Sequence, residues 1–365
     1  MPTLPRMPLR PILIATTIAA ALGATACGSD VQENTPTAPE ALTGPQGGWE
    51  ATRAFSHAPL ELADIASVLS LGSFTDGSAL PSADAIVQPR RDGVTVRAMA
   101  GGVVIETDEA RGCVTVQSGA AVATRYCGVR RDQRLVPGVP VHGGQHLGRF
   151  DAVIAPEGVR IRVLDQRVHR TGWIRPERYG NLRHASFFAG YLADSLRSQV
   201  FALVERASPD LEGRIDYDQR RRLVGSWFDT PAVLPATSAM TSSASAAPFP
   251  SSDPSVELAP RALTFAYDAR RPGQVRIAVG AALTGTLGLH GTYGVAWENA
   301  DPGAVALETG IVRYTLFRTG DADRVEAVGS LLVGLLDDTS VRVEALPPNH
   351  TGSAGFSSRA ITLLR

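Results

Sequence analysis

The chain contains no lysine, and all 35 of its basic residues are arginine. A protein that carries a lipoyl or biotinyl group must present a modifiable lysine, so the sequence excludes this class of carrier. We attribute the absence itself to a codon composition rich in G and C. The 36 acidic residues leave a formal net charge of −1. This balance gives no reason to expect nucleic acid or an anionic surface as a partner.

Several common signatures of enzymes are also missing. We find no internal repeat, no phosphate-binding P-loop, no dinucleotide-binding fingerprint and no nucleophile elbow. Histidine is scarce, with 7 residues, and cysteine is scarcer, with 3. The 365 residues, 44% of them hydrophobic, nevertheless suffice for two or three domains with sizeable cores.

Residues 1–27 predict an export signal. Two arginines precede an apolar run at 12–22, which is too short to favour a permanent spanning helix, and residues 24–27 (ATAC) form a cleavage region. This arrangement resembles a bacterial lipoprotein signal, in which Cys27 becomes the lipid-modified N-terminus. The A-x-A pattern at 24–26 would also suit the ordinary signal peptidase, so simple secretion stays open.

Residues 28–50 are polar and rich in proline and glycine, which predicts a disordered tether. Together with the signal, the tether leads us to expect an exported protein in the cell envelope. Its lipid anchor would be its link to a membrane, and nucleic acid is not expected as a partner.

Residues 51–178 predict a compact antiparallel β domain, centred on residues 93–150. Short apolar runs rich in valine are separated there by Gly-Gly, Arg-Gly, Ser-Gly and Pro-Gly. Such punctuation is typical of successive short strands joined by tight turns.

Three motifs in this stretch match a known pattern. Residues 96–104 read VRAMAGGVV, residues 124–129 read TRYCGV, and residues 139–148 read VPVHGGQHLG. They resemble the V-x-A-x-x-x-G-x-V, T-x-Y-x-H-L and V-x-x-G-Q-x-L-G motifs of lysostaphin-type zinc endopeptidases. The resemblance implies the β scaffold of that family, the duplicated hybrid motif that is also seen in lipoyl-like folds.

The resemblance also implies where a zinc site would lie. The family takes its ligands from an H-x-x-x-D motif before the core, a histidine after the tyrosine, and an H-x-H motif on the final strand. Catalytic zinc needs three such ligands and one open position. The aligned positions here are Ala83, Val87, Gly128, Gly158 and Arg160. Arginine offers no lone pair to a metal, so we predict a pseudoenzyme with no metal, no cofactor and no catalytic residue.

The two cysteines of this core predict a disulfide. Lipidation of Cys27 would leave Cys113 and Cys127 as an even pair in an oxidising compartment. A hairpin with its turn at residues 118–121 places the two directly opposite each other on adjacent strands. Two separately buried thiols, or a reactive pair, remain the alternatives.

Other histidines and one aspartate leave an alternative function open, that of an active zinc enzyme. Relocated ligands for an active enzyme could come from His57, Asp84, His169 and His184. Convergence of three of them on one point would favour a zinc-dependent peptidoglycan endopeptidase. His142 and His146 have the i, i+4 spacing of a helical zinc motif, but glycines separate them, so we interpret both as surface turn residues.

The rest of the chain divides into three parts. Residues 179–228 predict an amphipathic helix over 186–207 and a strand pair over 213–218 and 223–228. Residues 229–257, rich in serine, alanine and proline, predict a flexible linker. Residues 258–365 contain seven short β patterns separated by turn signals, which predict a β-sandwich or a small barrel. The seven patterns lie at 263–268, 274–279, 291–297, 310–317, 330–335, 340–346 and 360–364.

The sequence therefore predicts a mainly β protein of the bacterial envelope. Its first expected role is to bind an envelope ligand, such as peptidoglycan, through an inactive peptidase-like domain. An active peptidase with relocated ligands is the alternative, and a structural or adaptor lipoprotein is the third.

Overall fold

The computed structural model describes residues 55–75, 78–229, 257–296, 299–318, 326–348, 350 and 355–365. The predicted signal, the tether, Cys27 and almost all of the predicted linker lie outside these residues. Among the described residues, no helix has both the length and the apolar character needed to cross a membrane. The fold is mainly β, as the sequence predicts.

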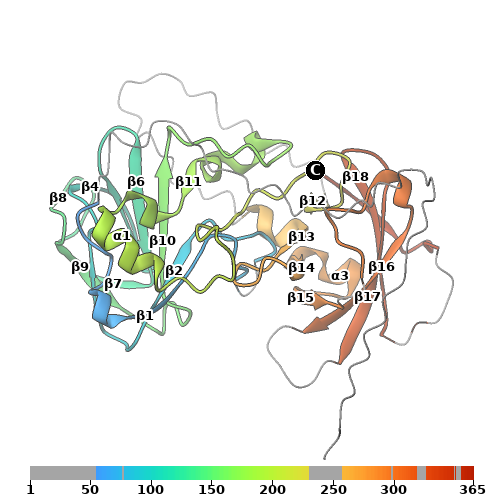
Figure 1. Cartoon of the computed structure of the whole chain (residues 1–365), viewed down its shortest axis with the longest axis horizontal. Coiled ribbons are helices and arrows are strands. Elements are labelled where there is room, and N and C mark those ends of the chain that lie inside the picture. Colours follow the sequence, from blue (N-terminus) through green and yellow to red (C-terminus); the bar gives the residue numbers. More distant parts are fainter. Residues whose placement is uncertain are drawn as a thin grey trace, which may run out of the picture. The chain divides into compact units, whose positions relative to one another are not determined.

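The first half of the described chain folds into two antiparallel sheets (Figure 1). The larger sheet has the strand order β1-β2-β10-β6-β5-β4-β8, and β11 also pairs with β10. Its strands are β1 (Ile65–Leu69), β2 (Ala85–Pro89), β10 (Val159–Asp165), β6 (Val122–Cys127), β5 (Cys113–Gln117), β4 (Gly102–Asp108), β8 (Pro140–Val141) and β11 (Ala185–Ser186). The smaller sheet contains β3 (Thr95–Arg97), β9 (His146–Phe150) and β7 (Val129–Arg131). The predicted compact antiparallel β region is confirmed.

Strict alternation along β10 gives the larger sheet two different faces. Val159, Ile161 and Val163 are each at most 1% exposed and belong to the hydrophobic core. Arg160 and Arg162, between them, must point to the opposite face because successive side chains alternate on a strand. One face of this sheet therefore builds the core, and the other is available for polar side chains.

The β5–β6 hairpin carries the predicted disulfide. Its register pairs Val114 with Tyr126, and the backbone N–H of Ser118 donates to the carbonyl of Val122 at 2.9 Å to close the turn. Cys113 and Cys127 are bonded, with their Cα atoms 4.1 Å apart. The prediction of a cross-strand disulfide is confirmed, and the two free-thiol alternatives are wrong.

The predicted helix over residues 186–207 is much shorter in the structure. A 3₁₀-helix, η4 (Phe188–Tyr191), precedes the two-turn helix α1 (Asp194–Phe201), and the backbone between them is extended. The carbonyl of Tyr191 accepts a hydrogen bond from the N–H of Phe55. Phe187, Phe188, Tyr191 and Leu192 are buried at 2% exposure or less. The aromatic pattern thus marks a segment buried on several sides, not one face of a long helix.

The second half of the described chain forms a closed barrel of eight antiparallel strands (Figure 1). Its strands are β12 (Gly225–Phe228), β13 (Ala262–Tyr267), β14 (Val275–Val279), β15 (Gly291–Val295), β16 (Val312–Arg318), β17 (Ala327–Leu335), β18 (Ser340–Leu346) and β19 (Ile361–Leu364). All seven predicted strands are present, and the barrel is the correct one of the two architectures considered. The eighth strand, β12, closes the barrel against β13 and β19. Residues 213–218, which we predicted as its hairpin partner, form no strand.

Short helices fill the remaining connections. They are η2 (Leu62–Asp64), η3 (Pro176–His184), η5 (Ala259–Arg261), η6 (Ala281–Leu283), α3 (Thr284–Leu287) and η7 (Leu307–Thr309).

The barrel interior follows the same alternation as the larger sheet. Leu331 and Val333 on β17 and Val341 and Val343 on β18 are fully buried, and all four belong to one core with Trp227. Burying each of these side chains contributes roughly 1.5–3 kcal/mol, so the barrel has its own stabilising core.

A buried carboxyl lies beside β12. Asp218 is 8% exposed and accepts hydrogen bonds from the N–H groups of Ser226 at 3.0 Å and Ile174 at 3.2 Å. Burial outweighs these bonds and the nearby Arg365, and raises the pKa of Asp218 from 3.8 to about 6. The folded protein therefore holds a proton at this carboxyl in a pH range where the unfolded chain has lost it.

This difference predicts a pH-dependent stability. Because the folded state binds more protons between pH 4 and pH 6, the free energy of unfolding should fall as pH rises through this window, by about 3 kcal/mol from this group. Asp218→Asn removes this titration, so between pH 4 and pH 6 the free energy of unfolding of the variant should fall less, or rise more, than that of the wild type. Urea unfolding at pH 4, 5, 6 and 7 measures the two slopes, and equal slopes would contradict the assignment.

Candidate functional site

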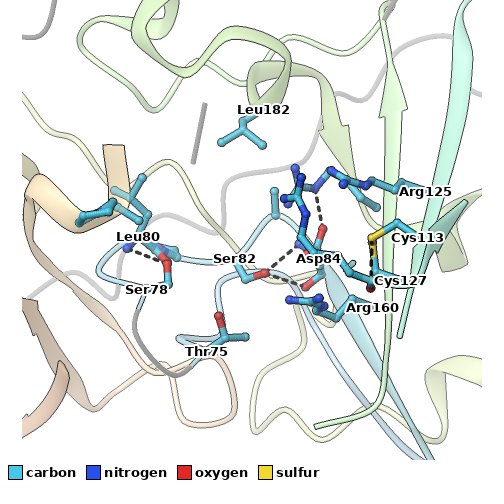
Figure 2. A pocket seen from close by; sticks show the side chains of 16 residues that line it. Thr75, Ser78, Leu80, Ser82, Asp84, Cys113, Arg125, Cys127, Arg160 and Leu182 are labelled. Carbon is cyan, nitrogen blue, oxygen red and sulfur yellow. Dashed lines mark hydrogen bonds and ion pairs between the residues drawn. A yellow bond between two sulfur atoms is a disulfide. The ribbon is translucent and has the colours of Figure 1, made fainter. Parts of the chain in front are cut away.

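A pocket of about 280 Å³ opens on the polar face of the larger sheet. Its walls include Thr75, residues from the segment at 78–84 before β2, and side chains of strands β5, β6 and β10. Figure 2 shows Arg125, Arg160 and Asp84 around this pocket, next to the Cys113–Cys127 disulfide.

The sheet register places the arginines side by side. Arg160 pairs with Cys127 across β10 and β6, and Arg162 pairs with Arg125. Paired residues of adjacent strands point to the same face, so Arg125 and Cys127 share the face of Arg160 and Arg162. The disulfide from Cys127 ties this face to β5. The arginines are therefore fixed on a braced section of sheet.

Each arginine of the pocket has a carboxylate near it, at very different distances. Arg162 Nε donates to Asp84 Oδ1 at 2.5 Å, and these two side chains are only 11% and 13% exposed. Arg160 Nε lies 3.6 Å from Glu157 Oε1, beyond hydrogen-bonding distance. The hydrogen bond between Arg162 and Asp84 holds β10 to the segment before β2. Arg160 makes no such bond to Glu157, so its Nε–H group is not used by this carboxylate.

A third carboxylate lies beside two of the arginines that line the pocket. Asp108 lies 2.6 Å from Arg111 Nε and 3.9 Å from Arg125 Nη2. Burial opposes its ionisation, but backbone and side-chain hydrogen bonds from Arg111 outweigh burial and hold the pKa of Asp108 below its usual value. Asp108 is therefore charged at neutral pH, and its shorter contact is with the more exposed arginine.

The five positions that align with the zinc ligands of the family do not lie together in the structure. Val87 is fully buried in the core, while Ala83 and Arg160 line the pocket. Gly128 and Gly158 have φ angles of 80° and 128°, and a Cβ there would lie 2.6 Å from Ala155 Cβ and from Val87 O, respectively. A side chain fits neither glycine without movement. The side chains of β10 that line the pocket are those of Arg160 and Arg162.

The four candidates for relocated ligands do not form one cluster. His169 and His184 have ring centroids 4.9 Å apart, and burial lowers the pKa of His184. Asp84 is bound to Arg162, and His57 Nδ1 lies 2.8 Å from Ser56 Oγ. In the part of the chain that the structure describes, no three His, Cys, Asp or Glu side chains are grouped so that they could hold a metal ion.

His142 and His146 lie at the surface, as the turn interpretation predicts. His142 precedes a Gly-Gly turn, and its N–H donates to Gln145 Oε1 at 2.9 Å. His146 begins β9 and is exposed. No helix joins the two.

The basic pocket was not predicted, although the sequence carries a signal for it. Arg160 and Arg162 alternate with three buried apolar residues in GVRIRV, and Arg125 lies two residues before Cys127. Alternation places Arg160 and Arg162 on one face of β10, and the pairing of β10 with β6 adds Arg125 to the same face.

The Asp84–Arg162 pair predicts a test of this arrangement. Asp84→Ala removes the carboxylate beside a guanidinium that is almost fully shielded from water, so the free energy of unfolding should fall by about 3 kcal/mol. Arg111→Ala is the matched control, because Arg111 is 47% exposed and an exposed pair contributes roughly 0–1 kcal/mol. Urea unfolding of both variants measures the difference, and similar values for the two would contradict it.

Comparison with known proteins gives only partial matches. No protein-family model and no curated protein sequence matches the chain. Part of the chain resembles a zinc-containing peptidase from Vibrio cholerae, with 17% identity and a TM-score of 0.25 over 32% of this chain and 38% of that one. The M23 metalloprotease pseudoalterin, from the deep sea, matches with 19% identity and a TM-score of 0.23 over 32% and 71%. Lysostaphin matches with 12% identity and a TM-score of 0.21 over 27% and 47%. The chain thus spans less than half of two of these three structures, and its structural neighbours include M23 and lysostaphin-type peptidases.

Proposed function

We propose that this chain is a binding protein of the cell envelope, and that its peptidase-like β domain holds a ligand without cleaving it. The observation that carries the proposal is the row of Arg125, Arg160 and Arg162 on the sheet face that lines the pocket. A braced pocket with several guanidinium groups suits recognition of an anionic group.

The chemistry of the pocket argues against hydrolysis. Zinc-dependent cleavage of a peptide needs three ligands with free lone pairs and a bound water. Guanidinium groups are donors only and stay protonated. The carboxylate that lines the pocket with them, Asp84, already accepts a short hydrogen bond from Arg162. These side chains bind and orient a ligand, and none of them supplies a nucleophile.

Peptidoglycan is the ligand class that we propose. The motif resemblance suggests it, and the peptide part of peptidoglycan carries carboxylates that the pocket arginines can bind. A net charge of −1 for the whole chain means that the attraction is local to the pocket rather than a general affinity for polyanions.

The proposal includes a lipid anchor at Cys27, outside the described residues. Lipidation there, followed by the polar stretch at 28–50, would keep the folded part close to a membrane and within reach of the cell wall. A single acyl chain binds membranes only marginally, whereas two or more hold stably.

Binding without cleavage can be tested with the full-length protein in mild detergent. It should co-sediment with purified peptidoglycan sacculi, release no soluble fragments from them, and hold far less than one zinc per chain after dialysis. Sedimentation, chromatography of the supernatant and elemental analysis give the three readouts. Release of fragments together with equimolar zinc would instead support the active peptidase.

The anchor has its own test. Cys27→Ser should leave the folded domains unchanged but either stall processing or move the protein from the membrane to the soluble fraction, because the acylated thiol is lost. Membrane fractionation and intact mass of both forms measure this. A wild-type mature protein that washes off membranes in salt and lacks acyl mass would contradict the anchor.

A further inference from the structure

We infer that Arg160 is the centre of a carboxylate-binding subsite, which takes the C-terminal carboxylate of a short peptide ending in a small residue. The inference rests on the proposed function and names the part of the ligand that the pocket recognises.

Arg160 has hydrogen-bonding capacity that the described residues do not use. Its Nε is buried and makes no hydrogen bond to any described residue. The side chain as a whole is 26% exposed and lines the pocket, so a ligand can reach it. Its partner Glu157 stays 3.6 Å away and is itself partly exposed. A carboxylate that enters the pocket can bind at the exposed part of this guanidinium, which supplies charge-assisted hydrogen-bond donors.

The lining of the pocket favours an anion. Four arginines line it, and Asp84 is the carboxylate among the described lining residues. Asp108 and Glu157 lie beside Arg111 and Arg160, respectively. Guanidinium also binds carboxylate with two parallel hydrogen bonds, which gives geometric selectivity.

The pocket also offers room for a small apolar group beside the anion. Leu80, Pro81, Ala83 and Leu182 line it together with the arginines, and Figure 2 shows Leu80 and Leu182 at its rim. A methyl side chain next to a terminal carboxylate, as in a peptide ending in alanine, would meet both kinds of surface. A bare inorganic anion would leave the apolar side empty.

The scaffold holds this subsite in place before a ligand arrives. Arg160 lies on β10 between β2 and β6, and its partner in the β6 register is Cys127, which is disulfide-bonded to β5. Little conformational entropy is therefore lost on binding, and a preorganised donor gains affinity from that saving.

Calorimetric titration of the full-length protein in detergent tests the inference. The probes are N-acetyl-D-Ala-D-Ala with a free carboxylate and the same dipeptide as its C-terminal amide. The acid should bind at least about tenfold more tightly than the amide, the expected loss for a charge-assisted hydrogen-bond pair. Arg160→Gln should reduce the affinity for the acid to that for the amide. Arg160→Lys, which keeps the charge but not the fork, should fall between them.

Arg149→Gln is the matched control, because Arg149 is exposed on β9 of the smaller sheet and its removal deletes the same charge. It should bind the acid as the wild type does. Equal loss in the Arg149 and Arg160 variants would overturn the subsite and indicate a general charge effect. Inorganic phosphate that displaces the acid at lower concentrations than acetate does would also overturn it, in favour of a phosphoryl ligand.

The two proposals fail separately. If wild-type protein binds sacculi but does not distinguish acid from amide, the carboxylate subsite is wrong and the binding function stands. If it distinguishes acid from amide but does not bind sacculi, the subsite stands and the peptidoglycan function is wrong. The acid-to-amide comparison uses the wild-type protein, so it decides the matter even if a variant fails to fold.

Discussion

The pleat of the β-strand is the constraint on which this structure depends. Because successive side chains alternate, β10 can place Val159, Ile161 and Val163 in the core and Arg160 and Arg162 in the pocket at the same time. A shift of one residue in register would bury the arginines and expose the valines. The burial that stabilises the domain therefore also fixes the direction of its binding groups. The same rule organises the barrel, where alternate residues of β17 and β18 fill the interior.

Local signals in the sequence were enough for much of this fold. The turn at residues 118–121 set the hairpin register, and the register placed Cys113 opposite Cys127, where the structure has a disulfide. Seven barrel strands were predicted because each one is short, apolar and bounded by turn residues. These features depend on neighbours a few residues apart, so a single sequence reveals them.

Features that depend on distant contacts were harder to predict. Burial of residues 187–192 from several sides mimicked a helical pattern, and closure of the barrel by β12 could not be read from its four residues. The pocket was missed for another reason. In a chain whose basic residues are all arginine, single arginines carry little information, and the motif resemblance marked Arg160 as a lost ligand rather than as part of a row. Only the pairing of β10 with β6 brings Arg162 beside Arg125.

The central claim is that the guanidinium groups of the pocket bind the carboxylate of a ligand. Nitrogen-15 NMR of the arginine Nε–H groups tests it most directly, with Arg160→Lys to assign the resonance. Addition of the acid dipeptide should shift the Nε–H signal of Arg160, because a carboxylate bound to this guanidinium changes the surroundings of that group, and equimolar zinc should leave the signal unchanged. A signal that ignores the peptide but responds to zinc would contradict the account.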